Sequence, residues 1–315
     1  MKSLLVHLDD YLNARRALGT QLKEPGRTLR QFVELLREHN ARFISVELAL
    51  KWAKQSANVQ RATWARKLSM VRQFARWMNA LDPRHQVPPK RLLNVRHRRN
   101  KPHIYTEKEI HQLMATTAEV KPFEEMTRLN LRTLIGLLAA TGLRPGEASA
   151  LEIGDVDLKG RVLIIRDSKF GKSRHVPIHP STVEKLKSYA RRRDKLVPIP
   201  GAPTFFVGSR GAAMDLGTIR KAFKQVCIDC GLRRPADGNR SPREPRLQDF
   251  RHSFATKRII EWYRRGRDVA LEMPKLATYL GHASVGCTYW YLEAVPELLE
   301  MAAALRLKVN RGGRR

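Results

Sequence analysis

The chain has 315 residues, of which 42% are hydrophobic, and 60 Lys and Arg stand against 30 Asp and Glu. This length suits two ordinary domains that each bury a core, and the hydrophobic content argues against wholesale disorder. The net charge of +30 at pH 7 is the unusual feature. Such a surface attracts polyanions and releases their counterions, so we expect a nucleic acid partner. A ribosomal-type or merely soluble basic protein remains an alternative at this point.

Other classes of protein fit the sequence poorly. No stretch approaches the roughly 20 apolar residues of a membrane span, and Asp9 and Asp10 come too early for a signal peptide. Three cysteines do not suggest a disulfide scaffold. Cys227 and Cys230 have C-x-x-C spacing within a helical pattern, but no second Cys/His pair lies nearby, so we interpret them as ordinary helix cysteines. We therefore expect a cytoplasmic protein without a membrane partner.

Residues 1–92 are predicted to form a helical domain. The pattern is clearest at 60–79, where Trp64, Leu68, Phe74 and other apolar residues recur every three or four positions. Basic residues fill much of the remaining surface of this helix. They are Arg61, Arg66, Lys67, Arg72 and Arg76. A solvated charged face would explain one such helix, but in so basic a chain we favour contact with DNA phosphates.

A basic linker is predicted at residues 93–104. Prolines at 83, 88 and 89 interrupt the helical pattern, and a run of positive charge follows them. The basic residues of this run include Arg96, Arg98 and Arg99. Prolines followed by charges are typical of an exposed linker between domains, and the charge suggests that the linker follows a phosphate backbone.

A second domain is predicted at residues 105–295. Thr106 and Glu109 have the spacing of a capping box at a helix start. Short β-branched runs between about 156 and 178 predict a three-stranded antiparallel sheet. Helical patterns surround these runs at about 107–118, 123–141, 180–195, 215–230, 249–264 and 274–281, with a short helix near 284–292. The expected fold class is mainly α with a small antiparallel β-sheet, an α+β protein.

Arg144 lies at a predicted junction between two helices. Gly142 allows one helix to end in a left-handed turn, and Pro145 suits the first turn of the next. A guanidinium held at such a junction can bind a phosphate through two parallel hydrogen bonds. Glu147, three residues further on, is placed to orient it. Taken alone, this pattern fits an ordinary helix corner with a surface arginine better than a phosphate site.

Three more basic motifs follow. The predicted hairpin tip carries Lys169 and Lys172, followed by Arg174, and would insert into a DNA groove. Arg251 comes early in the helix predicted at 249–264, where the helix dipole favours an anion. His282 follows Gly281 at a predicted helix break, a place where a lone histidine is more often structural than functional.

In this order, the motifs resemble those of tyrosine recombinases, the phage integrase family. The resemblance covers nearly the whole chain and implies an N-terminal core-binding domain that binds DNA, a linker and a catalytic domain. Its most specific boxes are Thr141-Gly142-Leu143-Arg144, Arg251-His252 and Leu280-Gly281-His282, with Tyr291 nine residues after His282.

The resemblance implies a role for each matching residue. Arg144 and Arg251 would clamp the scissile phosphate, Lys169 would be the general acid with Lys172 as its rival, Glu147 would support Arg144, His282 would fill the second histidine position, and Tyr291 would be the nucleophile. Tyr289 is a rival to Tyr291, but the spacing from His282 favours Tyr291.

Gln248 departs from the family pattern, which usually has histidine three residues before the second arginine. Glutamine donates a hydrogen bond but does not move a proton near neutral pH. If this position only braces the phosphate, activity survives; if it must act as a general base, catalysis is slowed. We expect an active enzyme.

The implied reaction cuts and rejoins DNA through a 3′-phosphotyrosine intermediate and a Holliday junction. We find no nucleotide-binding glycine loop and no cluster of metal ligands in the sequence, so we expect no ATP, metal or other cofactor. The alternatives are relaxation of DNA by a type IB topoisomerase, and a DNA-binding protein with weakened catalysis, which Gln248 would explain.

The implied partners are double-stranded DNA and further copies of the chain. A tetramer on two duplexes is expected in the bacterial nucleoid, with accessory recombinases as further candidates. The sequence leaves open whether the DNA belongs to a transposon, a phage, an integron or the chromosome. Residues 296–315 carry a short apolar stripe and then a basic tail. The stripe comprises Leu298, Leu299, Ala302 and Leu305. We expect this segment to dock on a neighbouring subunit, and packing within its own chain is the alternative.

Overall fold

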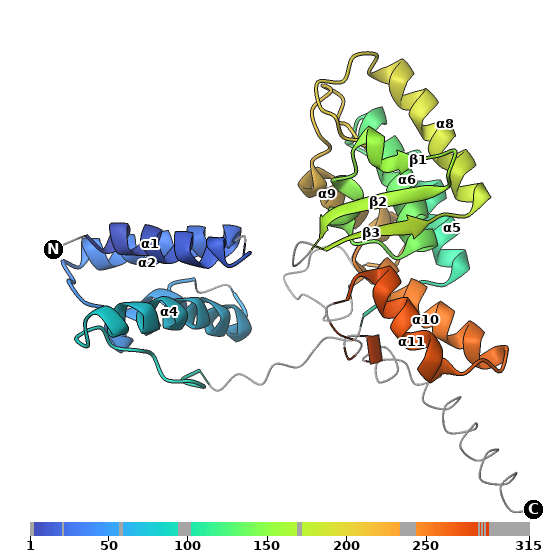
Figure 1. Ribbon diagram of the computed structural model, residues 1–315. Coiled ribbons are helices and arrows are strands. Elements are labelled where there is room, and N and C mark those ends of the chain that lie inside the picture. Colours follow the sequence, from blue (N-terminus) through green and yellow to red (C-terminus); the bar gives the residue numbers. More distant parts are fainter. Residues whose placement is uncertain are drawn as a thin grey trace, which may run out of the picture. The chain divides into compact units, whose positions relative to one another are not determined.

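A computed structural model shows two compact units, Met1–Arg99 and Asn100–Arg315 (Figure 1). It describes residues 3–20, 22–56, 59–93, 102–168, 172–233, 244–282, 284, 286, 288 and 289. Within these ranges, the side chains at positions 23, 167, 168 and 172 are not described. Each unit has its own apolar core, so each is considered separately.

The first unit is helical in its described part. Its helices are α1 (Leu4–Ala17), α2 (Lys23–Glu38), α3 (Val46–Lys54) and α4 (Arg61–Leu81). Leu12, Phe32 and Phe74 lie in the common core, which all four helices share. The predicted stripe on α4 is buried at Leu68 and Phe74, whereas Trp64 is half-buried and donates from Nε1 to the Ser56 carbonyl.

The second unit combines helices with one small sheet, which confirms the predicted fold class. Its helices are α5 (Glu107–Thr116), α6 (Glu125–Thr141), α7 (Pro145–Ser149), α8 (Pro180–Leu196), α9 (Leu216–Asp229), α10 (Asp249–Arg264) and α11 (Val269–Leu280). The strands are β1 (Val156–Asp157), β2 (Val162–Ser168) and β3 (Lys172–Pro177), in the order β1-β2-β3. Both pairings are antiparallel, with Leu163 opposite Val176 and Ile165 opposite Arg174. No helix in the described ranges is long and apolar enough to cross a membrane.

Helix α6 is the centre of this unit because α5, α8, α9 and α10 all pack against it. Its buried side chains include Leu131, Leu134 and Leu138. The start of the unit is joined to α10, since the Tyr105 ring stacks on Phe250 at 4.1 Å and its hydroxyl donates to the Arg246 carbonyl at 3.0 Å. The predicted capping box at Thr106 and Glu109 is present at the start of α5.

Helix α11 begins earlier than the sequence indicated. We expected a start near residue 274, but the helix begins at Val269 because the Asp268 carboxylate accepts hydrogen bonds from the Ala270 and Leu271 amides. Pro274 lies inside the helix and not at its start. Burial of Val269 and Met273 helps to hold the first turn in place. In Figure 1, α10 and α11 lie below β3, which is the arrangement that assembles the site described next.

Gly142 is predicted to tolerate no side chain. It ends α6 with φ of +64°, and a Cβ there would lie 2.6 Å from Phe254 Cδ1 and 3.1 Å from Leu280 Cδ2. Gly142→Ala is therefore expected to lower the free energy of unfolding by about 3 kcal/mol, from backbone strain and overpacking together. Urea denaturation of the full chain measures this loss.

Gly266→Ala is the matched control. Gly266 has the same φ of +64° but nothing within 4 Å of the position of a Cβ. We expect this variant to lose only about 1 kcal/mol, the cost of the left-handed backbone. Equal losses in the two variants would show that Phe254 moves aside at no cost and would contradict the prediction.

Candidate active site

Arg144 lies at the junction between α6 and α7. Gly142 ends α6 in a left-handed turn and Pro145 begins α7, as the sequence predicted. The Glu147 carboxylate fixes the arginine: Oε1 accepts from Nη1 at 2.5 Å, and Oε2 accepts from the Arg144 backbone amide at 3.1 Å. The Arg144 side chain keeps 27% of its surface exposed. It is thus held firmly and still faces solvent.

Arg251 is the third residue of α10 and is only 2% exposed. Its Nη1 donates to the Gly142 carbonyl at 3.1 Å, and its Nη2 donates to the Leu280 carbonyl at 2.5 Å. Arg144 Nη2 donates to the next carbonyl along the chain, that of Gly281, at 3.3 Å. The two arginines therefore share their anchors, which brings three of the predicted motifs together.

Arg174 on β3 completes this set. Its Nε donates to the Tyr279 carbonyl at 2.8 Å, and its Nη2 lies 2.8 Å from Glu147 Oε2. Three consecutive carbonyls at the end of α11, those of Tyr279, Leu280 and Gly281, thus accept from three different arginines. The last carbonyls of a helix have no partner within the helix and carry the negative end of its dipole, so cations are stabilised there.

His282 follows directly after these carbonyls. Burial lowers its pKa to about 4, and the positive charges of Arg251 and Arg144 add to the effect, so the ring is neutral at pH 7. Its Nδ1 lies 2.7 Å from Thr288 Oγ1. When the Thr288 hydroxyl donates to Nδ1, the proton of the neutral ring is on Nε2, which becomes a donor for an anionic oxygen.

Gln248 and His252 flank Arg251. Gln248 directly precedes α10 and is half-buried, and its carbonyl accepts from the Arg251 amide at 3.3 Å. Residues three apart share one face of a helix, so the Gln248 side chain lies on the face that carries Arg251. Burial lowers the pKa of His252 to about 4, although the nearby Asp249 carboxylate opposes the shift.

The charge of the assembled site suits a phosphate. Arg144, Arg174 and Arg251 bring three positive charges and Glu147 brings one negative charge, which leaves +2. Burial raises the pKa of Glu147, but its bonds to Arg174 and Arg144 outweigh this and hold that pKa below its ordinary value. The carboxylate therefore stays ionised at neutral pH and keeps the guanidinium groups in place.

Several predicted site residues lie outside the described part of the chain. These are Lys169, Tyr291, Arg96, Arg98 and Arg99, together with the side chain of Lys172. Tyr289, the rival nucleophile, is described and is 42% exposed. The choices between Tyr289 and Tyr291 and between Lys169 and Lys172 accordingly stay predictions.

The basic residues of α4 have differing surroundings. Arg66 pairs with Glu24 at 2.8 Å, Lys67 donates to Ser56 Oγ at 3.1 Å, and Arg72 donates to the carbonyls of Pro88 and Pro89. Arg61 and Arg76 are exposed. Contact of these five residues with DNA stays a prediction.

Two residues of the site did not emerge from the sequence in their observed places. Arg174 was expected on DNA, but its side chain is only 10% exposed and bonds to Glu147 and to the Tyr279 carbonyl. The alternation of β3 carried a signal for this, because Val176 on the same face of the strand is fully buried. Thr288, which bonds to His282, had no comparable signal.

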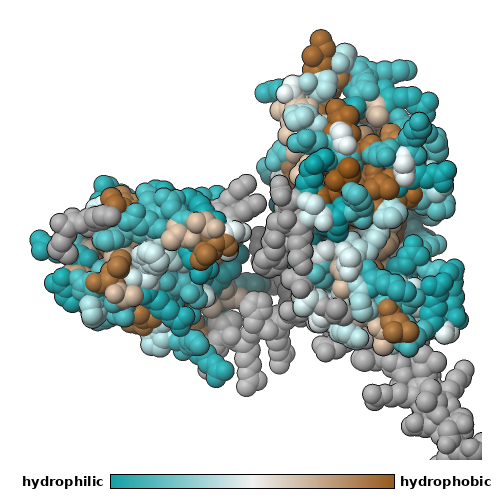
Figure 2. Space-filling view, in the orientation of Figure 1, coloured by the Kyte–Doolittle hydropathy of each residue, from teal (hydrophilic) through white to brown (hydrophobic). Residues whose placement is uncertain are grey.

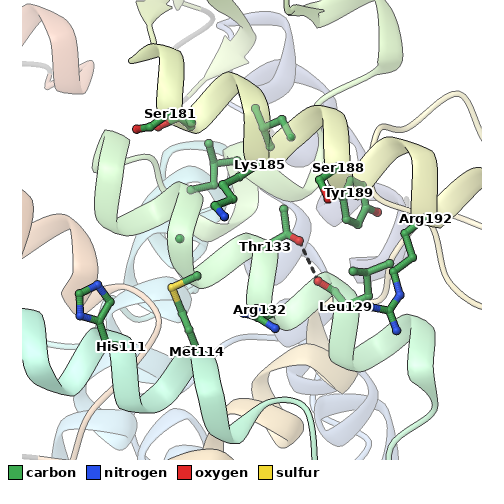
Figure 3. Close-up of a pocket in the computed structure, with 14 residues that line it drawn as sticks. His111, Met114, Leu129, Arg132, Thr133, Ser181, Lys185, Ser188, Tyr189 and Arg192 are labelled. Atoms are coloured by element: carbon green, nitrogen blue, oxygen red, sulfur yellow. Dashed lines mark hydrogen bonds between the residues drawn. The ribbon is translucent and has the colours of Figure 1, made fainter.

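A groove on the second unit lies apart from these residues. It has a volume of about 500 Å³ and is formed by α5, α6 and α8. In Figure 3, side chains of α8 and α5 approach from opposite sides of α6, with Lys185 and Met114 among them. None of the predicted catalytic residues lines this groove. In the described part of the chain, no cluster of three or more His, Cys, Asp or Glu could hold a metal.

Comparison with known proteins gives consistent matches. The sequence matches the phage integrase family over residues 104–297. A putative integrase/recombinase of Sinorhizobium fredii, y4rB, is 40% identical over 301 residues, which cover 94% of each chain. The tyrosine recombinase XerC of Mycobacterium leprae is 27% identical over 285 residues, which cover 89% of this chain and 86% of the relative.

The fold is also found in solved structures. The Tn1549 transposon integrase in complex with transposon right end DNA has a TM-score of 0.66 and 14% identity, over 98% of this chain and 100% of that one. At this identity the likeness shows the fold alone. The family match, in contrast, covers more than half of the sequence. The chain therefore belongs to the phage integrase family and is a DNA strand transferase of the tyrosine recombinase type.

Proposed function

We propose that this protein is a site-specific DNA recombinase that cleaves double-stranded DNA with Tyr291 and rejoins it to a partner strand through a Holliday junction. The observation that carries the proposal is the common anchoring of Arg144 and Arg251 on the carbonyls of residues 142, 280 and 281. The XerH recombinase bound to difH substrate and the Tn1549 integrase on transposon DNA share its fold, which supports DNA as the partner.

The proposed reaction is a transfer of a phosphoryl group. The Tyr291 hydroxyl loses its proton to water as its oxygen attacks the scissile phosphorus. The bond from phosphorus to the 5′ oxygen breaks, and that oxygen takes a proton from Lys169, with Lys172 as the alternative donor. A phenol with a reference pKa of about 10 is a weak nucleophile at neutral pH. The barrier is lowered because fixed guanidinium groups stabilise the charge that develops on the phosphate.

The covalent intermediate removes the need for ATP. The 3′-phosphotyrosine bond retains the energy of the phosphodiester, so a 5′-hydroxyl of either strand can reverse the attack. Arg144 and Arg251, with His282 as a neutral donor, neutralise the phosphate oxygens as a metal ion does in many nucleases. The proposed mechanism therefore runs on side chains alone.

The first unit and the linker are proposed to bind the duplex on which this reaction takes place. The exposed Arg61 and Arg76 on α4 are the strongest candidates for phosphate contacts, since the other basic residues of α4 already bond to protein groups. On the face drawn in Figure 2, hydrophilic side chains are common on both units, and hydrophobic patches lie among them. We propose that the protein acts on nucleoid DNA in the bacterial cytoplasm, on a mobile element such as a transposon.

A tetramer is proposed to carry out strand exchange, with residues 296–305 of one copy docked on the next. The groove of α5, α6 and α8 offers a matching surface. Leu129, Leu137 and Leu186 are apolar, and the lining also carries positive charges at Arg132 and Lys185. The segment pairs its apolar stripe with Glu297 and Glu300. Apolar burial with complementary charge is the usual basis for capture of a helix in a groove. Accessory recombinases would add to this assembly.

The nucleophile assignment is tested with a nicked suicide substrate, from which the cleaved strand end is lost and the covalent adduct accumulates. Tyr291→Phe is expected to abolish the adduct while DNA binding changes by less than about twofold, because the hydroxyl reacts but binds little. Tyr289→Phe is the matched control and is expected to keep the adduct.

Each other outcome has a definite meaning. An adduct that survives Tyr291→Phe but not Tyr289→Phe would make Tyr289 the nucleophile. Binding by the wild type with no adduct would favour a DNA-binding protein with weakened catalysis. Relaxation of supercoiled DNA without exchange between two sites would favour the topoisomerase alternative.

Gln248→His tests what glutamine does at its position. Gln248 lies on the same face as Arg251, so a histidine there is expected to donate the same hydrogen bond and to leave the cleavage rate equal or raise it by up to about tenfold. Single-turnover cleavage of the suicide substrate measures the rate. A large loss would mean that the glutamine side chain makes a specific contact that histidine cannot make.

Ser188→Trp tests the groove. Ser188 is an exposed residue that lines the groove, so an indole there is expected to block docking. Binding to a single duplex is expected to change by less than about twofold, while assembly of two duplexes falls by about tenfold or more, as measured by mass photometry. Lys187→Trp, on the outer surface of the same helix, is the control. Unchanged assembly would show that the segment docks elsewhere.

A further inference from the structure

Arg174 is less exposed than Arg144, and its side chain bonds to protein groups. Its side chain is 10% exposed, against 27% for Arg144. On β3 it alternates with the exposed residues Ser173 and His175 and shares its face with the buried Val176. Opposite it on β2 lies Ile165, which is 2% exposed. Strand geometry therefore directs Arg174 into the unit and away from solvent.

The guanidinium of Arg174 joins three elements that are distant in the sequence. Its two Nη atoms lie 3.3 and 2.8 Å from the two oxygens of Glu147 on α7, and its Nε donates to the Tyr279 carbonyl on α11 at 2.8 Å. This forked contact with a carboxylate suits a planar guanidinium, whereas a lysine ammonium is a single point of charge.

The backbone at Gly281 lies close to the same guanidinium group. A Cβ at position 281 would lie 2.8 Å from Arg174 Nη1 and 3.0 Å from Cζ. The guanidinium thus lies directly against the backbone that precedes His282. The φ of +67° favours glycine there, and a side chain at this position would displace the guanidinium.

We propose that Arg174 is a positioning residue for DNA cleavage, which aligns Arg144 through Glu147 and fixes the turn that carries His282. The proposal rests on the proposed function, because it assigns Arg174 to the chemical step and not to binding. It replaces the phosphate contact that the basic hairpin suggested. Without Arg174, Glu147 would keep Arg144 as its one ionic partner among the described residues, and the end of α11 would lose one of the three arginines bonded to it.

Arg174→Met and Arg174→Lys test the proposal by single-turnover cleavage of the suicide substrate and by equilibrium DNA binding. Arg174→Met is expected to slow cleavage by about 100-fold, the usual effect of misplacing a catalytic group by about 1 Å. Its DNA affinity is expected to stay within about threefold, and the slope of log affinity against log salt is expected to be unchanged. Lys159→Met, an exposed lysine in the turn between β1 and β2, removes one charge as the control.

The lysine variant separates positioning from phosphate contact even where the methionine variant folds poorly. Lysine keeps the charge and binds phosphates well, so a phosphate contact would be nearly restored by it. A positioning role would not be restored by lysine, because one ammonium cannot hold both Glu147 oxygens and the Tyr279 carbonyl. We expect Arg174→Lys to cleave about tenfold more slowly than the wild type, with normal binding. Thermal unfolding of each variant checks the fold.

A pH profile gives a readout that a merely structural role would not change. The charged groups bonded to Glu147 are Arg144 and Arg174, and nearby His282 stays neutral because its pKa is about 4. In Arg174→Met, burial is expected to raise the pKa of Glu147, so its carboxylate protonates and releases Arg144 as the pH falls from neutral into the acid range. Cleavage should gain an acid limb in this range, which Glu147→Gln in the same background should remove.

The outcomes of these experiments distinguish a positioning role of Arg174 from a phosphate contact. A phosphate contact would give a different result: Arg174→Met would bind DNA more weakly, and the slope of log affinity against log salt would fall by about one. If Arg174→Lys also restored binding, the proposal would be overturned. Wild-type cleavage rates in both variants would show that Arg174 has no role in this step. Failure of the wild type itself to form an adduct would instead refute the proposed function, so the two failures are distinguishable.

Discussion

The end of α11 is the constraint on which the rest of the site depends. The carbonyls of Tyr279, Leu280 and Gly281 have no partners within the helix, and each accepts a hydrogen bond from a different arginine. Buried carbonyls without partners are costly, and so are buried guanidinium groups. Each group satisfies the other, so α6, β3, α10 and α11 are held in one arrangement. The left-handed turn at Gly281 presents these carbonyls together.

Glu147 balances the charge of this arrangement. It bonds to Arg144 and Arg174, while Arg251 donates to the carbonyls of Gly142 and Leu280. The three guanidinium groups and the one carboxylate together carry a charge of +2, which makes the site complementary to a phosphate that gains negative charge in the transition state. The same donors would have to reorganise at every turnover if they were free in water. Here the fold has already placed them.

Most of the fold and much of the site followed from local patterns. Helical spacing predicted α4 and α6, and alternation with glycines predicted the sheet, because the period of apolar residues reports which face is buried. The junction at Gly142 and Pro145 was also confirmed, since its backbone requirements are local. The start of α11 was misplaced because the Asp268 cap was overlooked. The environment of Arg174 differed from expectation because this residue lies on the same face of β3 as the buried Val176.

The sequence by itself determined the helices, the strands, the order of the basic motifs and the family, because each of these depends on neighbouring residues or on a fixed spacing. Only the tertiary structure decided which arginines converge and on what. Arg144 and the Gly281 carbonyl are 137 positions apart, and Arg174 and the Tyr279 carbonyl are 105 apart. No periodicity reaches over such distances, and a backbone carbonyl has no signature in a sequence. Packing of α10 against α6, and of α11 against α10 and β3, brought these groups within hydrogen-bonding distance, so that three separate motifs form one site.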